Sequence, residues 1–324
     1  MAKAKKGVNR EELLADVAEM YYLEDKTQAE ISKAIGITRS AISRILTEAR
    51  QKGIVDIRVR RPLSFDSALE DQLQNSFKLE RVHVINSNSN GKYDALRERL
   101  GRAGAKLLEE LTHDDQIIGV AWGTTVNATI EAYEHPAPRG IRVVQLVGVL
   151  GATRHTYSGQ ALVENLVRKL SGEGTYLYTP FIVESAAAAQ ILMNDRSVQE
   201  AITMGRQANL ALSGIGSTDP EYCSLYKGGH ISDEDLKTLQ EAGAVGDVAG
   251  HYYDIMGRPA EVEFHERNVG ISKEDFLSIP LRFAVAGGLP KAEAITGAIC
   301  GGYVNALVTD DVTAAQVLAL AAEH

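Results

Sequence analysis

Cysteine and long apolar runs are scarce in this sequence, and their scarcity excludes several classes of protein. The 324 residues include two cysteines, Cys223 and Cys300, which lie far apart and form no C-x-x-C pair. We therefore expect no disulfide framework and no metal site. No apolar run reaches the roughly 18 residues of a membrane-spanning helix. The basic residues 1–10 are followed by no apolar segment, so we expect no secretory signal, no membrane partner and a cytoplasmic protein.

Charge is distributed unevenly along the chain. The net charge is −9, which by itself argues against a nucleic-acid partner. Residues 1–61, however, contain 13 Lys/Arg and 9 Asp/Glu, whereas residues 62–324 contain 21 and 34. A basic segment joined to an acidic body fits one DNA-facing module attached to a part that does not bind DNA. We therefore predict two domains, residues 1–61 and residues 62–324.

The segment from residue 27 to residue 53 predicts a helix, a tight turn and a second helix. Each helix has one apolar face, formed by Ala29, Ile31, Ala34 and Ile35 in the first and by Ile42, Ile45, Leu46 and Ala49 in the second. Thr27 and Thr38 are suited to cap the two N-termini, and Gly36 can adopt the left-handed conformation between them. A third amphipathic helix, over residues 10–23, would pack behind this pair.

The exposed side of the second helix presents hydrogen-bond donors and no carboxylate. These candidate DNA-contacting residues are Thr38, Arg39, Ser40, Ser43 and Arg44, joined by Gln28 of the first helix. The N-terminal end of a helix that enters the major groove needs such donors, because bases and phosphates present acceptors there. An ordinary helical hairpin at a domain corner is the structural alternative, and the cationic surface favours DNA binding.

Beyond residue 80, β-branched runs alternate with amphipathic helices. We expect strands at 81–85, 116–121, 141–146, 175–178, 209–213, 281–286 and 306–309, and helices at 64–77, 92–112, 124–133, 160–171, 185–194, 197–208, 233–242, 291–301 and 311–321. This alternation predicts an α/β fold with a largely parallel sheet covered on both faces. A further strand is expected at 54–61, whose arginines serve either as a phosphate-contacting wing or as a plain linker.

Four glycine-containing loops follow predicted strands of this sheet. Their candidate ligand-binding residues, loop by loop along the chain, are Gly123, Thr124 and Thr125 in the first, Gly148, Gly151 and Gln160 in the second, Gly214, Gly216 and Ser217 in the third, and Lys291 in the fourth. Ligands of parallel sheets bind beyond the carboxyl ends of the strands, and free N–H groups at helix N-termini attract anions. Glycine also simply turns a chain, but four such loops together favour an oxyanion or phosphate pocket.

Two charged residues have both a structural and a functional interpretation. Asp247, among small residues, is placed to bind sugar hydroxyl groups or equally to stabilise a turn. Lys291 either neutralises a phosphate or is a solvated residue of a first helical turn. Its glycine-rich setting favours the phosphate.

The chain resembles the SorC/DeoR-type family of bacterial sugar-responsive regulators over nearly its whole length. The resemblance rests on the pattern Q-x-E-I-x-x-x-I-G-I-T-R-S-x-I-S-R-I-L and on residues 122–125, 214–217, 243–247, 286–288 with Lys291, and 307–310. It implies a winged-type helix-turn-helix domain and a Rossmann-like domain similar to sugar-phosphate isomerases. It also implies a homo-oligomer, dimer or tetramer, and a sugar-phosphate pocket lined by Thr124, Thr125, the loop 148–160, Asp247 and Lys291.

Two functions remain open at this point. The first is a transcriptional regulator, a repressor of a carbohydrate catabolic operon, whose partners are double-stranded operator DNA and a sugar or sugar-phosphate effector, with no cofactor and no catalytic residue. The second is an active isomerase or deaminase with an accessory helix-turn-helix domain. Proton transfer at a sugar carbon needs a positioned base, for which Asp247, His155 and His251 are candidates.

Overall fold

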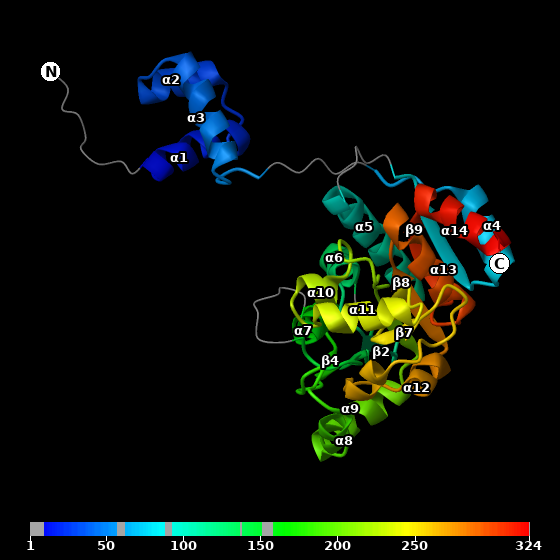
Figure 1. Ribbon diagram of the computed structural model, residues 1–324. Helices are drawn as coiled ribbons and strands as arrows, with labels where there is room; N and C mark the ends of the chain where they lie inside the picture. The colour runs from blue at the N-terminus through cyan, green and yellow to red at the C-terminus, as the bar shows by residue number, and fades with distance from the viewer. Residues whose placement is uncertain (1–9, 57–61, 88–92, 137, 151–157, 324) are drawn as a thin grey trace. The chain divides into compact units, whose positions relative to one another are not determined.

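The protein forms two compact units, Met1–Pro62 and Leu63–His324. The computed structural model describes residues 10–56, 62–87, 93–136, 138–150 and 158–323 (Figure 1). Across the described residues, no helix combines the length and the apolar character that crossing a membrane requires.

The N-terminal unit contains three helices, α1 (Arg10–Tyr22), α2 (Gln28–Ile35) and α3 (Arg39–Gln51). Its core consists of Leu14, Val17, Ala18, Ile31, Ile42, Ile45, Leu46 and Ala49. The predicted apolar face of α3 is thus wholly buried. Ala29 and Ala34 of α2 are exposed instead, since α2 is short and an alanine loses little by remaining in water.

The predicted caps fix the turn between α2 and α3. Thr27 forms a capping box with Glu30, and the side chain of Thr38 accepts a hydrogen bond from the backbone N–H of Ala41. Gly36 has a φ of 79°, a left-handed conformation that favours glycine. The expected strand at 54–61 does not form over residues 54–56, and residues 57–61, with the arginines of the proposed wing, lie outside the described residues.

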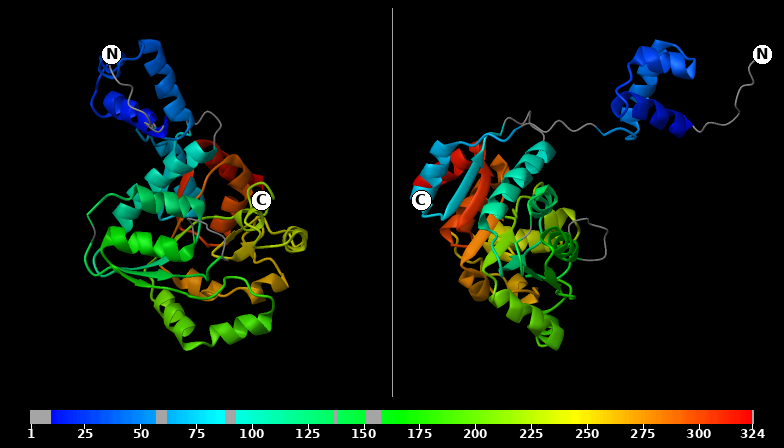
Figure 2. Two further views of the ribbon diagram at one scale, coloured as in Figure 1. Left: turned by 90° about the vertical axis from the view of Figure 1, so that its left-hand side faces the viewer. Right: turned by 180° about the vertical axis from the view of Figure 1, so that it is seen from behind.

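The larger unit is built on one parallel sheet (Figures 1 and 2). The sheet has the order β1-β9-β8-β5-β2-β3-β4. Its strands are β1 (Arg81–Ile85), β2 (Ile117–Val120), β3 (Arg142–Gln145), β4 (Glu173–Thr175), β5 (Leu210–Ser213), β8 (Leu281–Val285) and β9 (Ala306–Asp310). A separate antiparallel hairpin contains β6 (Gly246–Val248) and β7 (His251–Tyr253).

Helices cover both faces of the sheet. The α-helices are α4 (Ser67–Phe77), α5 (Tyr93–Leu111), α6 (Thr124–Ala132), α7 (Gly159–Leu170), α8 (Ala186–Met193), α9 (Arg196–Arg206), α10 (Ser224–Lys227), α11 (Asp233–Glu241), α12 (Lys273–Ser278), α13 (Ala292–Cys300) and α14 (Asp311–Glu323). Two 3-10 helices, η1 (Glu263–Arg267) and η2 (Leu289–Lys291), complete the unit. The apolar residues of α5, α6 and α7 join one core cluster, and those of α11 to α14 join the other. Consequently β2 and β5 are buried throughout, as expected for a covered parallel sheet.

The order of the strands reverses between β2 and β5. The chain proceeds outward from β2 through β3 to β4, then returns to β5 and proceeds outward through β8 to β9. This is the strand order of the Rossmann-like fold, so the predicted fold class is confirmed. In such sheets the crevice for a ligand opens beyond the carboxyl ends of the two strands at the reversal, here β2 and β5.

Two expectations about elements of the larger unit were wrong, and one element was not predicted. The first amphipathic helix begins at Ser67 and not at residue 64, because Asp66 caps it and Phe65 pairs in antiparallel fashion with Ile85. The strand expected at 175–178 lies at Glu173–Thr175. The hairpin β6–β7 was not predicted, since its strands have three residues each and show no alternation long enough to read.

Candidate functional site

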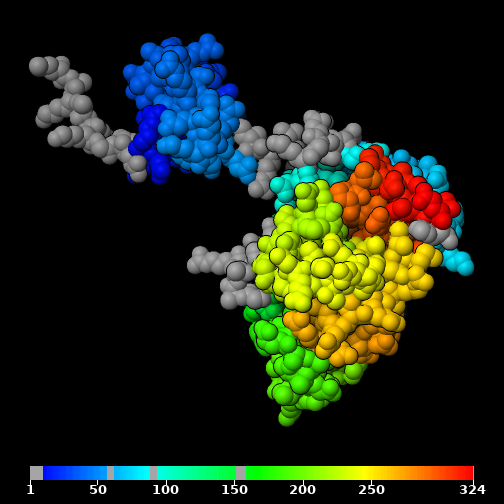
Figure 3. All heavy atoms as spheres, viewed as in Figure 1, coloured from blue at the N-terminus to red at the C-terminus, as the bar shows by residue number. Residues whose placement is uncertain are grey.

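A cavity of about 740 Å³ lies at the reversal point of the sheet. It is lined by residues of the loop after β2, of the start of α5 and of the segment 220–230 after β5, together with Lys291. Leu150 and Ser158, from the predicted loop after β3, also line it. The part of the chain that contains α10, α11 and the residues between and after them, yellow-green to yellow in Figure 3, forms much of the visible face of this unit. The predicted pocket residues Gly123, Thr124 and Lys291 lie together in the cavity.

The loops after β2 and β5 approach each other at Gly123 and Gly214. A Cβ atom placed on Gly123 would lie 3.6 Å from the Cα of Gly214, an ordinary van der Waals contact. Gly214 is not among the described residues that line the cavity.

The N-terminus of α6 faces the cavity without a side-chain cap. Gly123 is the N-cap residue and makes no side-chain hydrogen bond to the first turn. Free N–H groups and the helix dipole at such an end favour an anion. Thr124 lines the cavity, but Thr125 is buried, and its hydroxyl donates to the carbonyl oxygen of Val285 at 2.6 Å. The structure therefore places the Thr124 hydroxyl near the ligand and uses that of Thr125 to fasten α6 to β8.

Lys291 brings a buried cation to the same cavity. Its side chain is almost fully buried, and Nζ donates to the carbonyl oxygen of Ile215 at 2.7 Å. An ammonium group has three donors, and this is the one hydrogen bond that it makes within the described part of the chain. Burial lowers the pKa of Lys291, while the nearby carboxylate of Asp247 raises it.

Asp247 lies beneath the loop after β5 and is not among the described residues lining the cavity. Its Oδ2 accepts from the backbone N–H of Gly250 at 3.1 Å, and its carbonyl oxygen accepts from the N–H of Gly216 at 2.8 Å. A Cβ on Gly216 would lie 1.9 Å from Oδ1. Burial raises the pKa of Asp247 to about 6, against the Gly250 N–H and the charge of Lys291, which lower it. The carboxyl group thus holds the turn and the loop from below.

The remaining predicted pocket residues lie elsewhere. Gly148 packs against the backbone of Pro180. A Cβ atom placed on Gly148 would lie 2.6 Å from the carbonyl oxygen of Pro180. Gln160, in the first turn of α7, contacts Glu164 at 3.4 Å and is not among the described lining residues. Gly151 and His155 lie outside the described residues.

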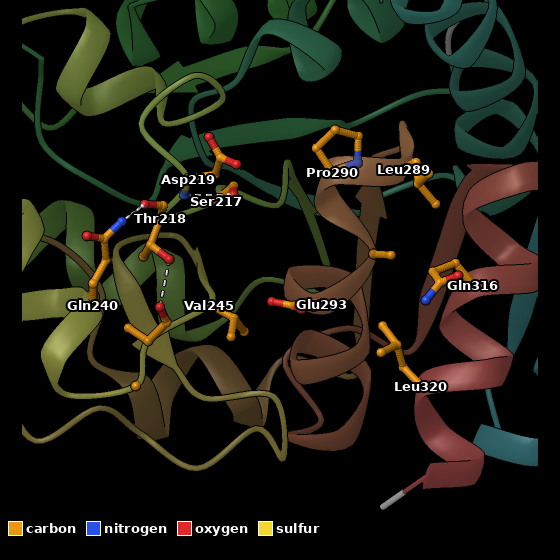
Figure 4. A pocket seen from close by; sticks show the side chains of 13 residues that line it. Ser217, Thr218, Asp219, Gln240, Val245, Leu289, Pro290, Glu293, Gln316 and Leu320 are labelled. Atoms are coloured by element: carbon orange, nitrogen blue, oxygen red, sulfur yellow. Dashed lines mark hydrogen bonds between the residues drawn. The ribbon is translucent and has the colours of Figure 1, made fainter.

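Ser217 borders a second cavity, of about 650 Å³ (Figure 4). In this cavity Asp219 N–H donates to Ser217 Oγ at 3.1 Å, and Gln240 Nε2 donates to the Thr218 carbonyl at 2.8 Å. The loops around Asp219 and Pro290 form one side of this cavity and continue directly into residues that line the first. Consecutive residues of the same two loops therefore line the two cavities.

Sequence reasoning missed the aromatic and charged wall of the first cavity. Tyr93 and Tyr222 meet edge to face, with ring centroids 6.1 Å apart. Arg97 pairs with Asp94 at 3.1 Å, and Lys227 Nζ donates to the carbonyl of Glu221 at 3.1 Å. The segment 220–230 has no periodicity from which its place could be inferred. Tyr93 and Arg97 were within reach of prediction, because they begin a helix that follows a strand.

The predicted DNA-contacting residues lie on one accessible surface of the N-terminal unit. Thr38, Arg39, Ser40, Ser43 and Arg44 are all exposed on α3, and Gln28 is half-buried at the start of α2. The one carboxylate of α3, that of Glu48, forms ion pairs with Arg10 and, at 3.3 Å, with Lys52. Its charge is therefore compensated within the unit.

Comparison with known proteins gives a consistent result over almost the full chain. Residues 61–319 match the family described as "Putative sugar-binding domain", and residues 14–52 match "Sigma-70, region 4". The deoxyribonucleoside regulator of Bacillus subtilis is 31% identical over 306 residues, covering 94% of this chain and 96% of its own. The transcriptional regulator LsrR of Escherichia coli O139:H28 is 32% identical, with 98% of each chain covered.

Solved structures agree with these relatives. The full-length sorbitol operon regulator SorC of Klebsiella pneumoniae has a TM-score of 0.71 and 26% identity, and covers 95% of this chain and 99% of its own. A domain of a possible sugar-binding transcriptional regulator of Arthrobacter aurescens has a TM-score of 0.72 and 25% identity, and covers 80% of this chain and 100% of its own.

Proposed function

Because this chain belongs to the SorC family of sugar-binding transcriptional regulators, we propose that it represses a carbohydrate catabolic operon under the control of a sugar-phosphate effector. The N-terminal unit, residues 1–61, binds operator DNA. The unit over residues 62–324 binds the effector and forms the homo-oligomer, a dimer or tetramer located in the cytoplasm. The protein carries out no catalysis and needs no cofactor.

The anion-binding end of the first cavity is the observation that carries this proposal. Lys291 supplies a buried ammonium group, and the uncapped N-terminus of α6 supplies N–H groups beside Thr124. A phosphate monoester accepts hydrogen bonds from both kinds of donor. Tyr93 and Tyr222 provide an aromatic wall on which the carbon skeleton of a sugar or polyol can lie.

DNA recognition is assigned to the exposed face of α3. Arg39 and Arg44 carry the positive charge that phosphates attract, and Thr38, Ser40 and Ser43 add short donors for base edges. A dimer would place two such helices in successive turns of the major groove. The effector can change DNA binding only by binding one arrangement of the subunits more tightly than another.

Two of the three base candidates for the alternative, a sugar-phosphate isomerase or deaminase, lie among the described residues. Among the described residues, the carboxyl group of Asp247 is bonded to Gly250 and covered by the loop after β5. His251 lies in a different cavity, where burial lowers its pKa to about 4. A general base must lie within hydrogen-bond reach of the proton that it abstracts, and neither group borders the first cavity.

Two measurements on the full chain test the proposal. Thermal unfolding is recorded with ribose 5-phosphate, glucose 6-phosphate, sorbitol 6-phosphate and their unphosphorylated forms, and each addition is also assayed for product. We expect at least one phosphorylated compound to raise the unfolding temperature of the protein, and its unphosphorylated form to raise it less. We expect the protein to convert none of these compounds to product. Turnover at about 1 s⁻¹ or faster, within the ordinary enzymatic range, would overturn the assignment as a regulator without catalysis.

A further inference from the structure

The chain segment that joins the two units is fastened to the edge of the sheet. Residues 63–66 run antiparallel to β1, with Asp66 N–H donating to the Val84 carbonyl at 2.8 Å and Asn86 N–H donating to the Ser64 carbonyl at 3.0 Å. The side-chain amide of Asn86 also donates to Ser64 Oγ at 3.1 Å. Any displacement of Asn86 is therefore passed to Ser64, at the beginning of the larger unit.

A buried arginine holds the end of β1 from the other side. Arg99, in the middle of α5, donates from Nη2 to the carbonyl oxygen of Asn86 at 2.6 Å and from Nη1 to that of Ser87 at 3.0 Å. Its exposed fraction is 8%, so these charge-assisted bonds are shielded from water. The fork geometry of the guanidinium ties two successive carbonyls to one helix.

The same helix forms part of the effector cavity. Tyr93, Asp94 and Arg97 of its first turn line the cavity, and Arg99 follows Tyr93 by six residues, about 9 Å along the helix axis. The ring of Tyr93 also packs on Gly288. A Cβ atom placed on this glycine would lie 3.1 Å from the ring. A ligand that contacts the first turn thus acts on the helix that carries Arg99.

Helix α5 is packed backbone to backbone against α6, which bears the anion-binding end. Cβ atoms on Gly101 and Gly104 would lie 2.6 Å from Ala128 and 2.5 Å from the Thr129 hydroxyl. Packing this close leaves no room for one helix to slide independently of the other. The two helices that face the ligand therefore move together.

We propose that Arg99 is a positioning residue that couples the effector cavity to the segment leading to the DNA-binding unit. It converts a shift of the α5–α6 pair into a shift of Asn86, and through Asn86 into a shift of Ser64. The inference rests on the proposed function for its biological meaning, because it concerns how occupancy of that cavity reaches the DNA-binding unit. The inference states that a change at Tyr93 alters the backbone amides of Asp66 and Asn86, and that Arg99 transmits this change.

A double-mutant cycle tests this coupling without any ligand. Tyr93→Ala is introduced into the wild-type chain and into Arg99→Lys, which keeps the charge but loses the two-pronged contact. Amide hydrogen exchange is followed at Asp66 and Asn86. We expect Tyr93→Ala to accelerate exchange about fivefold in the wild type and less than about twofold in Arg99→Lys, as for residues in one network.

Arg282→Lys is the matched control. Arg282 is a half-buried arginine that also donates to backbone carbonyls, to that of Gly302 at 2.9 Å and to that of Leu277 at 3.2 Å. These hydrogen bonds lead neither to α5 nor to the segment 63–66. In this background Tyr93→Ala should keep its full effect. An equal effect of Tyr93→Ala in the wild type and in Arg99→Lys, or no effect in the wild type, would overturn the proposal.

A second measurement separates this inference from the proposed function. Operator DNA selected with the full chain is titrated by fluorescence anisotropy in the presence and absence of ribose 5-phosphate, glucose 6-phosphate and sorbitol 6-phosphate. We expect the most effective of these compounds to stabilise Arg99→Lys against heat as it does the wild type, but to change operator affinity at least about fivefold less. A wild-type operator affinity that ignores all three compounds would count against the proposed function, whereas the exchange cycle alone decides the role of Arg99.

Discussion

The Nζ of Lys291 lies 2.7 Å from the carbonyl oxygen of Ile215, so a side chain from one loop is joined to the backbone of another. Ile215 follows β5, and Lys291 follows β8 through the 3-10 helix η2. The ammonium group is buried between two strand ends, and Lys291 lines the cavity. This contact fixes the direction in which the cation points before any ligand arrives.

Replacing this lysine should weaken effector binding specifically. For Lys291→Met we expect the dissociation constant of the most stabilising sugar phosphate to rise tenfold to a hundredfold, because a hydrogen bond to a charged group contributes about 1.5–3 kcal/mol. DNA binding without effector should be unchanged. Isothermal titration calorimetry and anisotropy measure the two quantities. Loss of effector-free DNA binding would point to a role in folding or assembly instead.

Lys169→Met is the control for that experiment. Lys169 Nζ also donates to backbone carbonyls, those of Glu131 at 2.9 Å and Tyr133 at 2.6 Å, but the residue does not border the cavity. Its replacement should leave the dissociation constant of the sugar phosphate within about twofold of the wild type.

Arg39 and Arg44 should contribute to operator affinity alone. We expect Arg39→Ala and Arg44→Ala each to lower operator affinity about tenfold. Each should also make the slope of the logarithm of the association constant against the logarithm of the salt concentration shallower, by about one unit for each phosphate that the arginine neutralises. Effector binding should not change. Arg196→Ala, which removes an exposed arginine from the larger unit, serves as the control. If both α3 variants bind the operator within twofold of the wild type, α3 is not the recognition helix.

Two glycines of one loop should respond differently to the same substitution. Gly216→Ala brings a methyl group to 1.9 Å from Asp247 Oδ1, so we expect a loss of about 2 kcal/mol or more in the free energy of unfolding. In Gly214→Ala the nearest atom, Thr125 Oγ1, lies at 3.5 Å, an ordinary contact, and stability should change by less than about 1 kcal/mol. Urea unfolding ranks the two variants, and equal losses would contradict the described packing of Asp247.

The buried carboxyl group of Asp247 should make the protein more stable in mild acid. Its pKa is raised from 3.8 to about 6 by burial, so the folded state binds a proton that the unfolded state releases between these values. The contribution of this group to stability therefore grows as the pH falls from 7.5 to 5, by about 1 kcal/mol. Asp247→Asn lacks this contribution.

Comparing the wild type with Asp247→Asn at pH 7.5 and pH 5 measures how much Asp247 contributes to the pH dependence of stability. Urea unfolding at pH 7.5 and pH 5 should show the wild type gaining about 1 kcal/mol relative to Asp247→Asn on acidification. Other titrating groups cancel in the difference between the two proteins. An unchanged difference would mean that the pKa of Asp247 is ordinary in the folded protein.

The sequence predicted the fold better than the site, for a physical reason. The strand Arg81–Ile85 was located to the residue, because polar residues alternate in it with β-branched ones, the period of two that a half-buried strand shows. The caps Thr27 and Thr38 were correct, since capping depends on a few neighbouring residues. The start of α4 was wrong because pairing of Phe65 with β1, a contact between distant segments, prevailed over the helical pattern of the segment.

Predicting the site required knowledge of where side chains point. Thr124 and Thr125 are alike in sequence, yet one lines the cavity and the other donates to Val285 inside the core. Lys291 was inferred from its position after a strand, and it does border the cavity. Tyr222 and Lys227 come from a segment without periodicity, so only the folded chain shows that they face α5.

The antiparallel pairing of residues 63–66 with β1 has a consequence for handling the larger unit in isolation. β1 is the last strand on its side of the sheet, and a bare strand edge recruits other chains. A fragment that starts at Ser67 would leave the edge of β1 open, whereas one that starts at Leu63 keeps its own cover. The shorter fragment should precipitate at concentrations at which the longer one stays dissolved.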